Sequence, residues 1–416
     1  MTTLNTLLSD PAIPSPDIKK DLSTVSAVAA SGDAFWLAVS VDQSPLSPKE
    51  LQDLPHDDTS TYEDSMPPTM LRPSRVQKID VSRVLVLYNP HSGAQKGEAL
   101  AEQARQFFDI HMMEVEYQSY SPSQHASQAT FIALEHKGHG EEICSTVDVT
   151  QYDVICCLGG DGTFHECVNG YMNRSDDARF KVPLAVLPGG TGNSFSLELS
   201  NSTDMDLALR HIMRGLIAPI DISEVAFPTD GTKTYCFNSL HWGLASKVNV
   251  TAEKLRWMGK AVRYTTAALV ELFNGDKTLA RVVYTDAENK QHKVEDEYSV
   301  CIANMICTAA KGMKLAPDAK LNDGLIDVIL IRSANTIDLA KVFAKFYDGT
   351  HKDLDFVDYI QCKEFSIVPF NRDQSLIDES KEDPKVAEEV LDIDGELKGI
   401  TPFHLKVLQQ ALYVII

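Results

Sequence analysis

The sequence lacks any apolar run of the roughly 18 residues that a membrane-spanning helix needs. Its first residues, Met1 to Leu4, show neither the basic segment nor the apolar core of a secretory signal peptide. None of the eight cysteines belongs to a Cys-x-x-Cys pair, which disfavours a zinc ribbon or a redox motif. We therefore expect reduced, structural cysteines and a cytoplasmic protein.

Positive charge is also scarce, because 38 Lys and Arg residues face 59 Asp and Glu residues and give a formal net charge of −21. Nucleic acid is excluded as a partner, since its phosphate backbone demands a basic surface. A general affinity for anionic membrane surfaces is disfavoured for the same reason. Any membrane contact must then use a local patch or an adaptor.

The length of 416 residues suffices for two domains with full cores. Residues 1–80 form an N-terminal extension, with one or two strands expected within 25–41 and a disordered linker, rich in Pro, Ser and Asp, at 43–75. Residues 81–221 show an α/β pattern. Residues 222–416 show spaced strands with polar turns, which predicts an antiparallel β-sandwich.

Walker A and dinucleotide fingerprints are absent, yet glycine turns follow three apolar runs that read as buried strands, Val84–Tyr88, Val154–Leu158 and Pro183–Leu187. The turns are Asn89–Gly97, Gly159–Thr163 and Pro188–Asn193. Parallel strands would bring these turns to one sheet edge, where open α/β sheets bind ligands. Both the exposed backbone of the glycines and the helix N-termini favour the binding of a phosphate there.

Asp161 lies inside the second turn, where its carboxylate would repel a phosphate. Its presence makes sense if it accepts a proton or orients a metal ion. The alternative is an ordinary strand-to-helix connection with an Asp near the N-cap.

Further elements follow from periodicity. In the α/β part we expect helices at Gly97–Asp109 and Met205–Met213, and a strand at Met113–Tyr117. The later part predicts helices near Ala252–Phe273 and at Ile337–Tyr347, an exposed loop at Asp373–Val386, and strands at Tyr235–Trp242, Ala280–Thr285, Tyr298–Ile302, Leu325–Ile331, Glu364–Val368 and His404–Leu408.

The motifs Asn-Pro-x-Ser-Gly, Gly-Gly-Asp-Gly-Thr, Pro-Gly-Gly-Thr-Gly-Asn and the late Asp394-Gly395-Glu396 resemble, in this order, those of the diacylglycerol kinase catalytic-domain family of lipid kinases. Within it, the sphingosine and ceramide kinase branch is similar. The resemblance covers roughly 81–416. It implies a phosphofructokinase-like ATP-binding domain followed by a β-sandwich, with ATP, Mg²⁺ and a lipid substrate at a membrane surface. It also implies transient peripheral recruitment and leaves a homodimer open.

The resemblance also implies site residues. Asp161 would be the general base, with a Mg²⁺-orienting role as the alternative, and Glu396 would be catalytic and a metal ligand. Asp323 would hold a second, structural metal, unless Asn322-Asp323-Gly324 is a plain turn. The nucleotide would contact Asn89, Pro90, His91, Ser92, Gly93, Gly159, Gly160, Gly162, Thr163, Gly190, Thr191, Gly192, Asn193, Arg256, Arg263, Asp394 and Gly395.

Two of these assignments compete with other uses of the same residues. Arg256 and Arg263 could instead belong to a membrane-docking helix or a solvated face. Asp394-Gly395-Glu396 could be a β-hairpin turn.

Lys247 and Asn249 limit which lipid can be the substrate, because they stand where sphingosine kinases carry acids. The second of those acids pairs with the sphingoid amine, which Asn249 cannot neutralise. We therefore expect a substrate with a primary hydroxyl, of sphingoid type or otherwise diacylglycerol or ceramide, without dependence on a cationic amine. Glu166 or Glu253 could still supply a substrate-binding acid. A non-catalytic nucleotide- or lipid-binding protein is the second class of function.

Overall fold

The computed structural model describes residues 76–118, 128–255, 267, 270–271, 277–309, 313–369 and 389–416. Several predicted features lie outside these residues: the N-terminal strands and linker, Arg256 and Arg263, most of the helix expected at Ala252–Phe273, and the loop expected at Asp373–Val386. The side chain of Glu253 is likewise not described.

A four-stranded parallel sheet forms the first half, in the order β5-β4-β2-β3. Its strands are β2 (Arg83–Tyr88), β3 (Gln128–Ala133), β4 (Val154–Gly159) and β5 (Leu184–Pro188). Its helices are α4 (Ser92–Gln95), α5 (Gly97–Gln118), α6 (His139–Thr146), α7 (Asp161–Met172), α8 (Ser194–Ser200) and α9 (Met205–Arg214), with short 3₁₀ turns at Val149–Gln151 and Ala178–Phe180. The strands predicted before the three glycine turns are confirmed.

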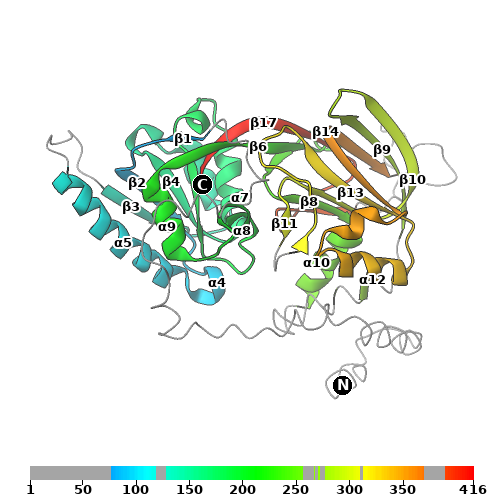
Figure 1. Cartoon of the computed structure of the whole chain (residues 1–416), viewed down its shortest axis with the longest axis horizontal. Helices are drawn as coiled ribbons and strands as arrows, with labels where there is room; N and C mark the ends of the chain where they lie inside the picture. Colours follow the sequence, from blue (N-terminus) through cyan, green and yellow to red (C-terminus); the bar gives the residue numbers. More distant parts are fainter. Residues whose placement is uncertain are drawn as a thin grey trace, which may run out of the picture.

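Helices cover both faces of this sheet (Figure 1). Side chains of α5 and α9 pack with Val84 and Val86 on one face. Side chains of α6 and α7 pack with Leu85 and Leu87 on the other. Successive residues of a strand point to opposite faces of the sheet. Strand β2 is therefore buried on both faces from Val84 to Tyr88, as its sequence predicted.

The strand predicted at Met113–Tyr117 is wrong, because α5 continues through these residues to Gln118. A helix that has already formed extends at the gain of one hydrogen bond per residue, and Met and Glu are good helix formers. The next strand is β3, which pairs in parallel with β2. The single strand predicted at Tyr235–Trp242 is in fact two, β7 (Lys233–Cys236) and β8 (Ser239–Gly243).

The second half is antiparallel, as predicted. Its further elements are α10 (Leu244–Lys254), β9 (Thr278–Asp286), β10 (Gln291–Asn304), β11 (Thr308–Ala309), β12 (Met313–Lys314), β13 (Ile326–Arg332), α12 (Thr336–Lys345), a 3₁₀ turn at Thr350–Asp353, β14 (Val357–Pro369), β15 (Val390–Ile393) and β16 (Glu396–Ile400). Strand β9 pairs with both β10 and β14, so β9, β10, β13 and β14 form a closed circuit of pairings. Strand β8 extends this circuit from β10, and β15 pairs with β8. The Asp-Gly-Glu turn connects β15 to β16.

Two long strands join the halves: β6 (Leu216–Ala226) and β17 (Phe403–Ile415). They pair with each other, and β17 also pairs with β14 in one half and, in parallel, with β5 in the other. Figure 1 shows β17, in red, running across the top of the molecule beside β6. The short β1 (Gln77–Lys78) pairs with β6. The predicted boundary at Asp221 falls within β6 and stays a prediction.

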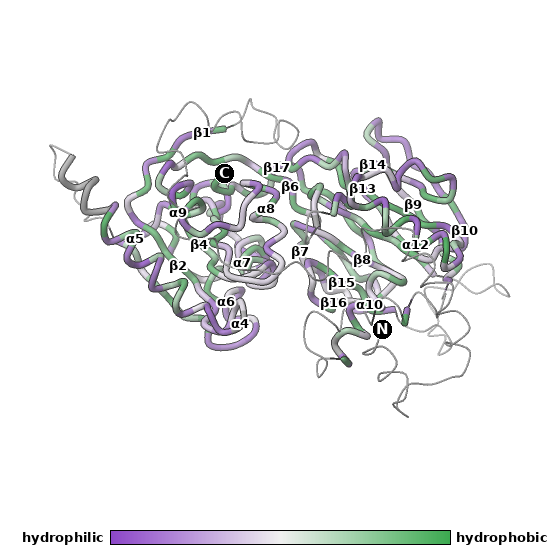
Figure 2. The backbone as a smooth tube through the Cα atoms, turned by 60° about the horizontal axis from the view of Figure 1, so that its bottom comes forward, coloured by the Kyte–Doolittle hydropathy of each residue, from purple (hydrophilic) through white to green (hydrophobic). Residues whose placement is uncertain are grey.

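The apolar segments, green in Figure 2, run through the interior of both halves, as the buried core clusters also show. No described helix is long and apolar enough to cross a membrane.

Candidate active site

The three glycine turns meet at the carboxyl ends of β2, β4 and β5. A Cβ added to Gly190 would lie 2.3 Å from Cα of Gly160, so the second and third turns touch through bare backbone. A Cβ added to Gly93, which has φ +54°, would lie 2.4 Å from the carbonyl oxygen of Gly189. Only glycine allows these close approaches, and glycine adopts a positive φ without strain. The predicted convergence of the turns is therefore present in the structure.

Polar groups line the meeting point. Helix α7 begins at Asp161, and no described side chain caps its N-terminus, so its partial positive charge faces the turns. The hydroxyl of Ser92 is buried and has no hydrogen-bond partner among the described residues. Asn193 shapes the third turn, because its Oδ1 accepts a hydrogen bond from the Gly190 N–H at 2.9 Å. Thr191 is exposed in that turn. These groups are suited to an anionic ligand.

Asp161 has a role that the sequence did not reveal. Its Oδ2 accepts from the Ser194 N–H at 3.0 Å and its Oδ1 from the Phe195 N–H at 3.2 Å, so it caps the N-terminus of α8. Burial raises the pKa of Asp161, the two N–H groups oppose that rise, and nearby Asp394 adds to it. The carboxylate thus ties the second turn to the third at the centre of the site.

Asp394 is 3% exposed and is bound on both oxygens. Its Oδ2 lies 2.8 Å from Nδ1 of His165 and accepts from the Phe237 N–H. Its Oδ1 accepts from the N–H groups of Asn238 and Ser239 and from the thiol of Cys236. This set fixes the Asp-Gly-Glu turn against α7. Asp394 therefore positions the turn, and its predicted nucleotide contact remains a prediction.

Glu396 is the group that this turn presents to the glycine loops. Its Oε1 lies 2.9 Å from where a Cβ of Gly162 would be, and its Oε2 pairs with Nζ of Lys137 at 2.6 Å. The Glu396 side chain is 34% exposed. The carboxylate is thus accessible and sits at the second glycine turn.

The predicted substrate residues are both engaged. Glu166 accepts from the Gly138 and Gly140 N–H groups at 2.8 and 3.1 Å, which caps the start of α6. The amide of Asn249 donates to Oδ2 of Asp392, a residue that sequence reasoning did not single out. Asp392 lies in β15, two positions before Asp394 in the turn that follows, and this spacing was the available signal.

The surroundings of Asp392 are polar and incompletely bonded. The residue is 2% exposed, and its Oδ1 has no partner within the described part of the chain. Nδ1 of His241 lies 3.6 Å from Oδ2. Lys247 is paired with Glu389 at 3.4 Å. The position next to Asn249 therefore holds the buried carboxylate of Asp392 as well as the neutral amide.

Asp323 lies in the turn before β13, where its Oδ1 accepts from the Leu325 N–H at 3.1 Å. Asp221 joins this turn to β17, since it accepts from the Gly324 and Gln410 N–H groups at 2.6 and 2.7 Å. A second metal at Asp323 remains a prediction.

The fold and the site are those of a kinase whose glycine turns would bind the nucleotide phosphates and which carries an attached β-sandwich. Residues 83–225 match the diacylglycerol kinase catalytic domain, and residues 238–416 match the YegS C-terminal NAD kinase beta sandwich-like domain. The chain thus carries the diacylglycerol kinase catalytic domain followed by this β-sandwich domain, and it is a lipid kinase.

Curated relatives cover most of the chain. Sphingosine kinase 1 of Arabidopsis thaliana is 26% identical over 79% of this chain and 71% of its own. Sphingoid long chain base kinase 4 of Schizosaccharomyces pombe is 25% identical over 78% and 73%. Diacylglycerol kinase of Bacillus subtilis is 24% identical over 80% and 96%. The crystal structure of a diacylglycerol kinase from Bacillus anthracis shares the fold, with a TM-score of 0.56 and 19% identity over 81% of this chain and 98% of that one.

Proposed function

We propose that the protein transfers the γ-phosphate of ATP, with Mg²⁺, to a primary hydroxyl of a sphingoid-type lipid. The observation that carries the proposal is the meeting of three bare glycine turns with the carboxylate of Glu396, which comes from the far end of the chain. Kinases need a phosphate cradle, a metal and a proton acceptor, and this site offers residues for each.

The phosphates would lie on the backbone of the glycine turns and at the N-terminus of α7, with the Ser92 hydroxyl as a further donor. Glu396 fits a Mg²⁺ ligand, because it is an accessible carboxylate oxygen donor at the second turn. A bound Mg²⁺ would neutralise phosphate charge. Asp394 does not fit that role, because both of its oxygens are already bound.

Asp161 is our candidate for the group that accepts the hydroxyl proton. Burial raises the pKa of Asp161, which strengthens it as a base, while the Ser194 and Phe195 N–H groups hold its orientation. Arg256 and Arg263 remain proposed nucleotide contacts. Access to the lipid would require transient peripheral contact of a cytoplasmic enzyme with a membrane.

The substrate class rests on the relatives that are named for sphingosine or sphingoid bases, with diacylglycerol or ceramide as the alternative. Two contacts bear on the predicted indifference to a cationic amine. Lys247 pairs with Glu389, which offsets the positive charge that would otherwise repel an amine. Asp392 offers a negative charge beside Asn249, where the sequence suggested only a neutral amide. The preference for amine-bearing lipids therefore has to be measured.

The experiment is kcat/KM for sphingosine, ceramide and diacylglycerol, with the native chain, Asn249→Asp and Asp392→Asn. We expect phosphorylation of the sphingoid base. If Asp392 holds its amine, Asp392→Asn lowers kcat/KM about tenfold or more for sphingosine and much less for ceramide, since a charge-assisted contact is lost. An equal effect on both lipids assigns Asp392 a positioning role. A native preference for diacylglycerol or ceramide contradicts the proposed substrate class.

A further inference from the structure

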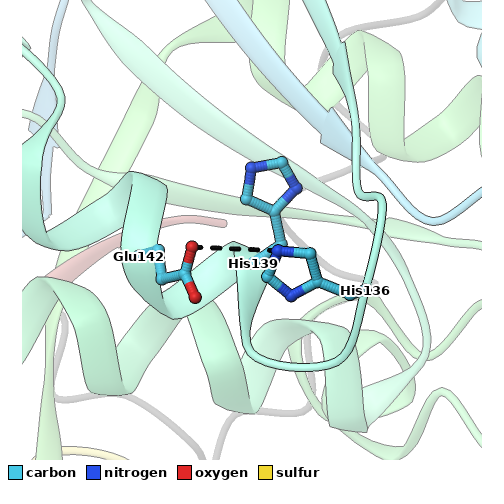
Figure 3. A group of neighbouring side chains, drawn as sticks. All are labelled: His136, His139 and Glu142. Atoms are coloured by element: carbon cyan, nitrogen blue, oxygen red, sulfur yellow. Dashed lines mark ion pairs between the residues drawn. The ribbon is translucent and has the colours of Figure 1, made fainter.

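Three potential metal ligands gather where the chain enters α6. His136, His139 and Glu142 each offer one ligand atom, and these atoms lie within 4.8 Å of one another. The two imidazole rings stack with centroids 4.8 Å apart, and Nε2 of His136 lies 3.9 Å from Oε2 of Glu142 (Figure 3). His136 and Glu142 are exposed, so an ion reaches the group from solvent.

The hydrogen bond of His136 suits ligation, whereas that of His139 has to change when a metal binds. Nδ1 of His136 lies 3.1 Å from the Lys137 carbonyl oxygen, so a proton on Nδ1 leaves the lone pair of Nε2 for a metal. Nδ1 of His139 accepts from the Glu135 N–H at 3.1 Å. Binding of a metal by His139 breaks this hydrogen bond or changes its geometry. Around Zn²⁺, with bonds of about 2.0–2.2 Å, ligand atoms sit about 3.3 Å apart, so modest side-chain movement closes the group.

The donor set selects the kind of ion. Imidazole nitrogens suit Zn²⁺ and its neighbours, whereas Mg²⁺ and Ca²⁺ prefer oxygen donors. Two His and one Glu are a known Zn²⁺ ligand set that leaves a fourth position for water. The group is therefore chemically distinct from the Mg²⁺ site proposed at Glu396.

The same segment carries the contacts that approach the catalytic turn. Lys137, next to His136, pairs with Glu396 at 2.6 Å. Gly138 and Gly140 donate to Glu166 of α7. An ion that holds His136 and His139 together fixes the backbone on both sides of Lys137.

We propose that His136, His139 and Glu142 form a binding site for a transition-metal dication of the Zn²⁺ class. Its occupancy slows phosphoryl transfer by holding Lys137 on Glu396, so that more Mg²⁺ is needed at that carboxylate. The second part rests on the proposed kinase function, whereas the binding site itself does not.

Binding is tested on the full chain by titration calorimetry with ZnCl₂ in excess Mg²⁺. We expect one ion per chain, and His136→Gln or His139→Gln to weaken its binding at least about tenfold, since loss even of a group that supports a ligand costs about 10–100-fold. His292→Gln is the matched control, because His292 pairs with Asp286 at 2.6 Å in another part of the fold. Far-UV circular dichroism confirms that each variant is folded.

Co²⁺ distinguishes this site from the free cysteines, of which Cys307 alone among the eight is not fully buried. Cobalt bound by nitrogen and oxygen shows no thiolate charge-transfer band. A thiolate band, or binding that both histidine variants retain, overturns the site.

The coupling is tested by titrating Mg²⁺ in kinase assays with and without Zn²⁺. Zn²⁺ should raise the Mg²⁺ concentration for half-maximal rate in the native chain and in His292→Gln, but not in His139→Gln. An unchanged Mg²⁺ titration in the presence of bound Zn²⁺ overturns the coupling and leaves the binding result standing. A chain without kinase activity would contradict the proposed function and not the metal site.

Discussion

Asp161, which is partly buried, and Asp394, which is buried, show that neighbouring carboxylates in one site take different tasks according to their donors. Asp394 is bound on both oxygens by backbone N–H groups, a thiol and His165, an arrangement that holds a turn in place. Asp161 has one N–H donor on each oxygen, and burial raises its pKa. The second environment leaves a carboxylate capable of taking a proton.

Asp161→Asn should lower kcat by about 10²–10⁴-fold, the usual effect of losing a general base, and change ATP affinity only a few-fold. The asparagine oxygen still accepts one of the two N–H bonds, so the cost in stability should be near 1 kcal/mol. Activity assays, ATP titration and thermal unfolding measure the three quantities.

The matched control is Asp204→Asn, because Asp204 caps α9 through the Leu207 N–H at 2.8 Å and stands outside the glycine turns. It should keep normal kcat and lose little stability, because asparagine caps a helix about as well as aspartate. Near-native turnover of Asp161→Asn would move the base to another residue.

Glu396→Gln should raise the Mg²⁺ concentration needed for half-maximal rate, because glutamine offers the ion a neutral oxygen in place of a charged one. Rates measured across a Mg²⁺ series test this. Glu224→Gln removes a comparable pair with Lys233 at the surface and should leave the series unchanged. Identical Mg²⁺ curves for Glu396→Gln and the native chain would assign Glu396 a structural role.

At the scale of elements, local patterns predicted the strands before the glycine turns because each is a short apolar run ended by glycine. The helix predicted for α5 ended too early, at Asp109, because the residues after it also fit a strand. Only tertiary packing decides between the two. The cap from Asp161 to α8 and the contact of Asn249 with Asp392 join residues far apart in sequence. Neither leaves a periodic signal that a single sequence displays.

The strand pair β13–β14 buries a titratable group. Asp327 faces Gln361 across the pair, accepts from its amide at 3.1 Å and lies 2.5 Å from the Tyr359 hydroxyl. Burial raises the pKa of Asp327 to about 7. The folded chain therefore keeps a proton that the unfolded chain releases from about pH 4 upward.

The free energy of unfolding should consequently fall as pH rises from about 4 to 7, by at most about 4 kcal/mol from this group, and Asp327→Asn should remove that part of the slope. Urea unfolding at several pH values measures it. Asp358→Asn, on β14 and partly exposed, is the control and should keep the native slope. Parallel curves for the native chain and Asp327→Asn would contradict the prediction.

At the scale of the whole molecule, the two halves share strands. Strand β17 pairs with β6 along most of its length, with β14 at one end and with β5 at the other. Asp221 on β6 fixes the same region through the Gly324 and Gln410 N–H groups. The Asp-Gly-Glu turn therefore reaches the glycine turns through a continuous sheet, and the sequence did not predict this sharing because strand pairing over such separations has no local pattern.

Shared strands predict that the halves unfold together. Leu412 lies opposite Ile220 in the β6–β17 pair and is fully buried, so Leu412→Ala should cost about 2–5 kcal/mol. Hydrogen exchange should then show the same loss of protection in β4 of the first half and β13 of the second, within one cooperative transition. Val294→Ala, at a position 40% exposed on β10, should change neither strand. Loss of protection confined to one half would show that the halves fold independently and that the sheet does not couple the Asp-Gly-Glu turn to the glycine turns.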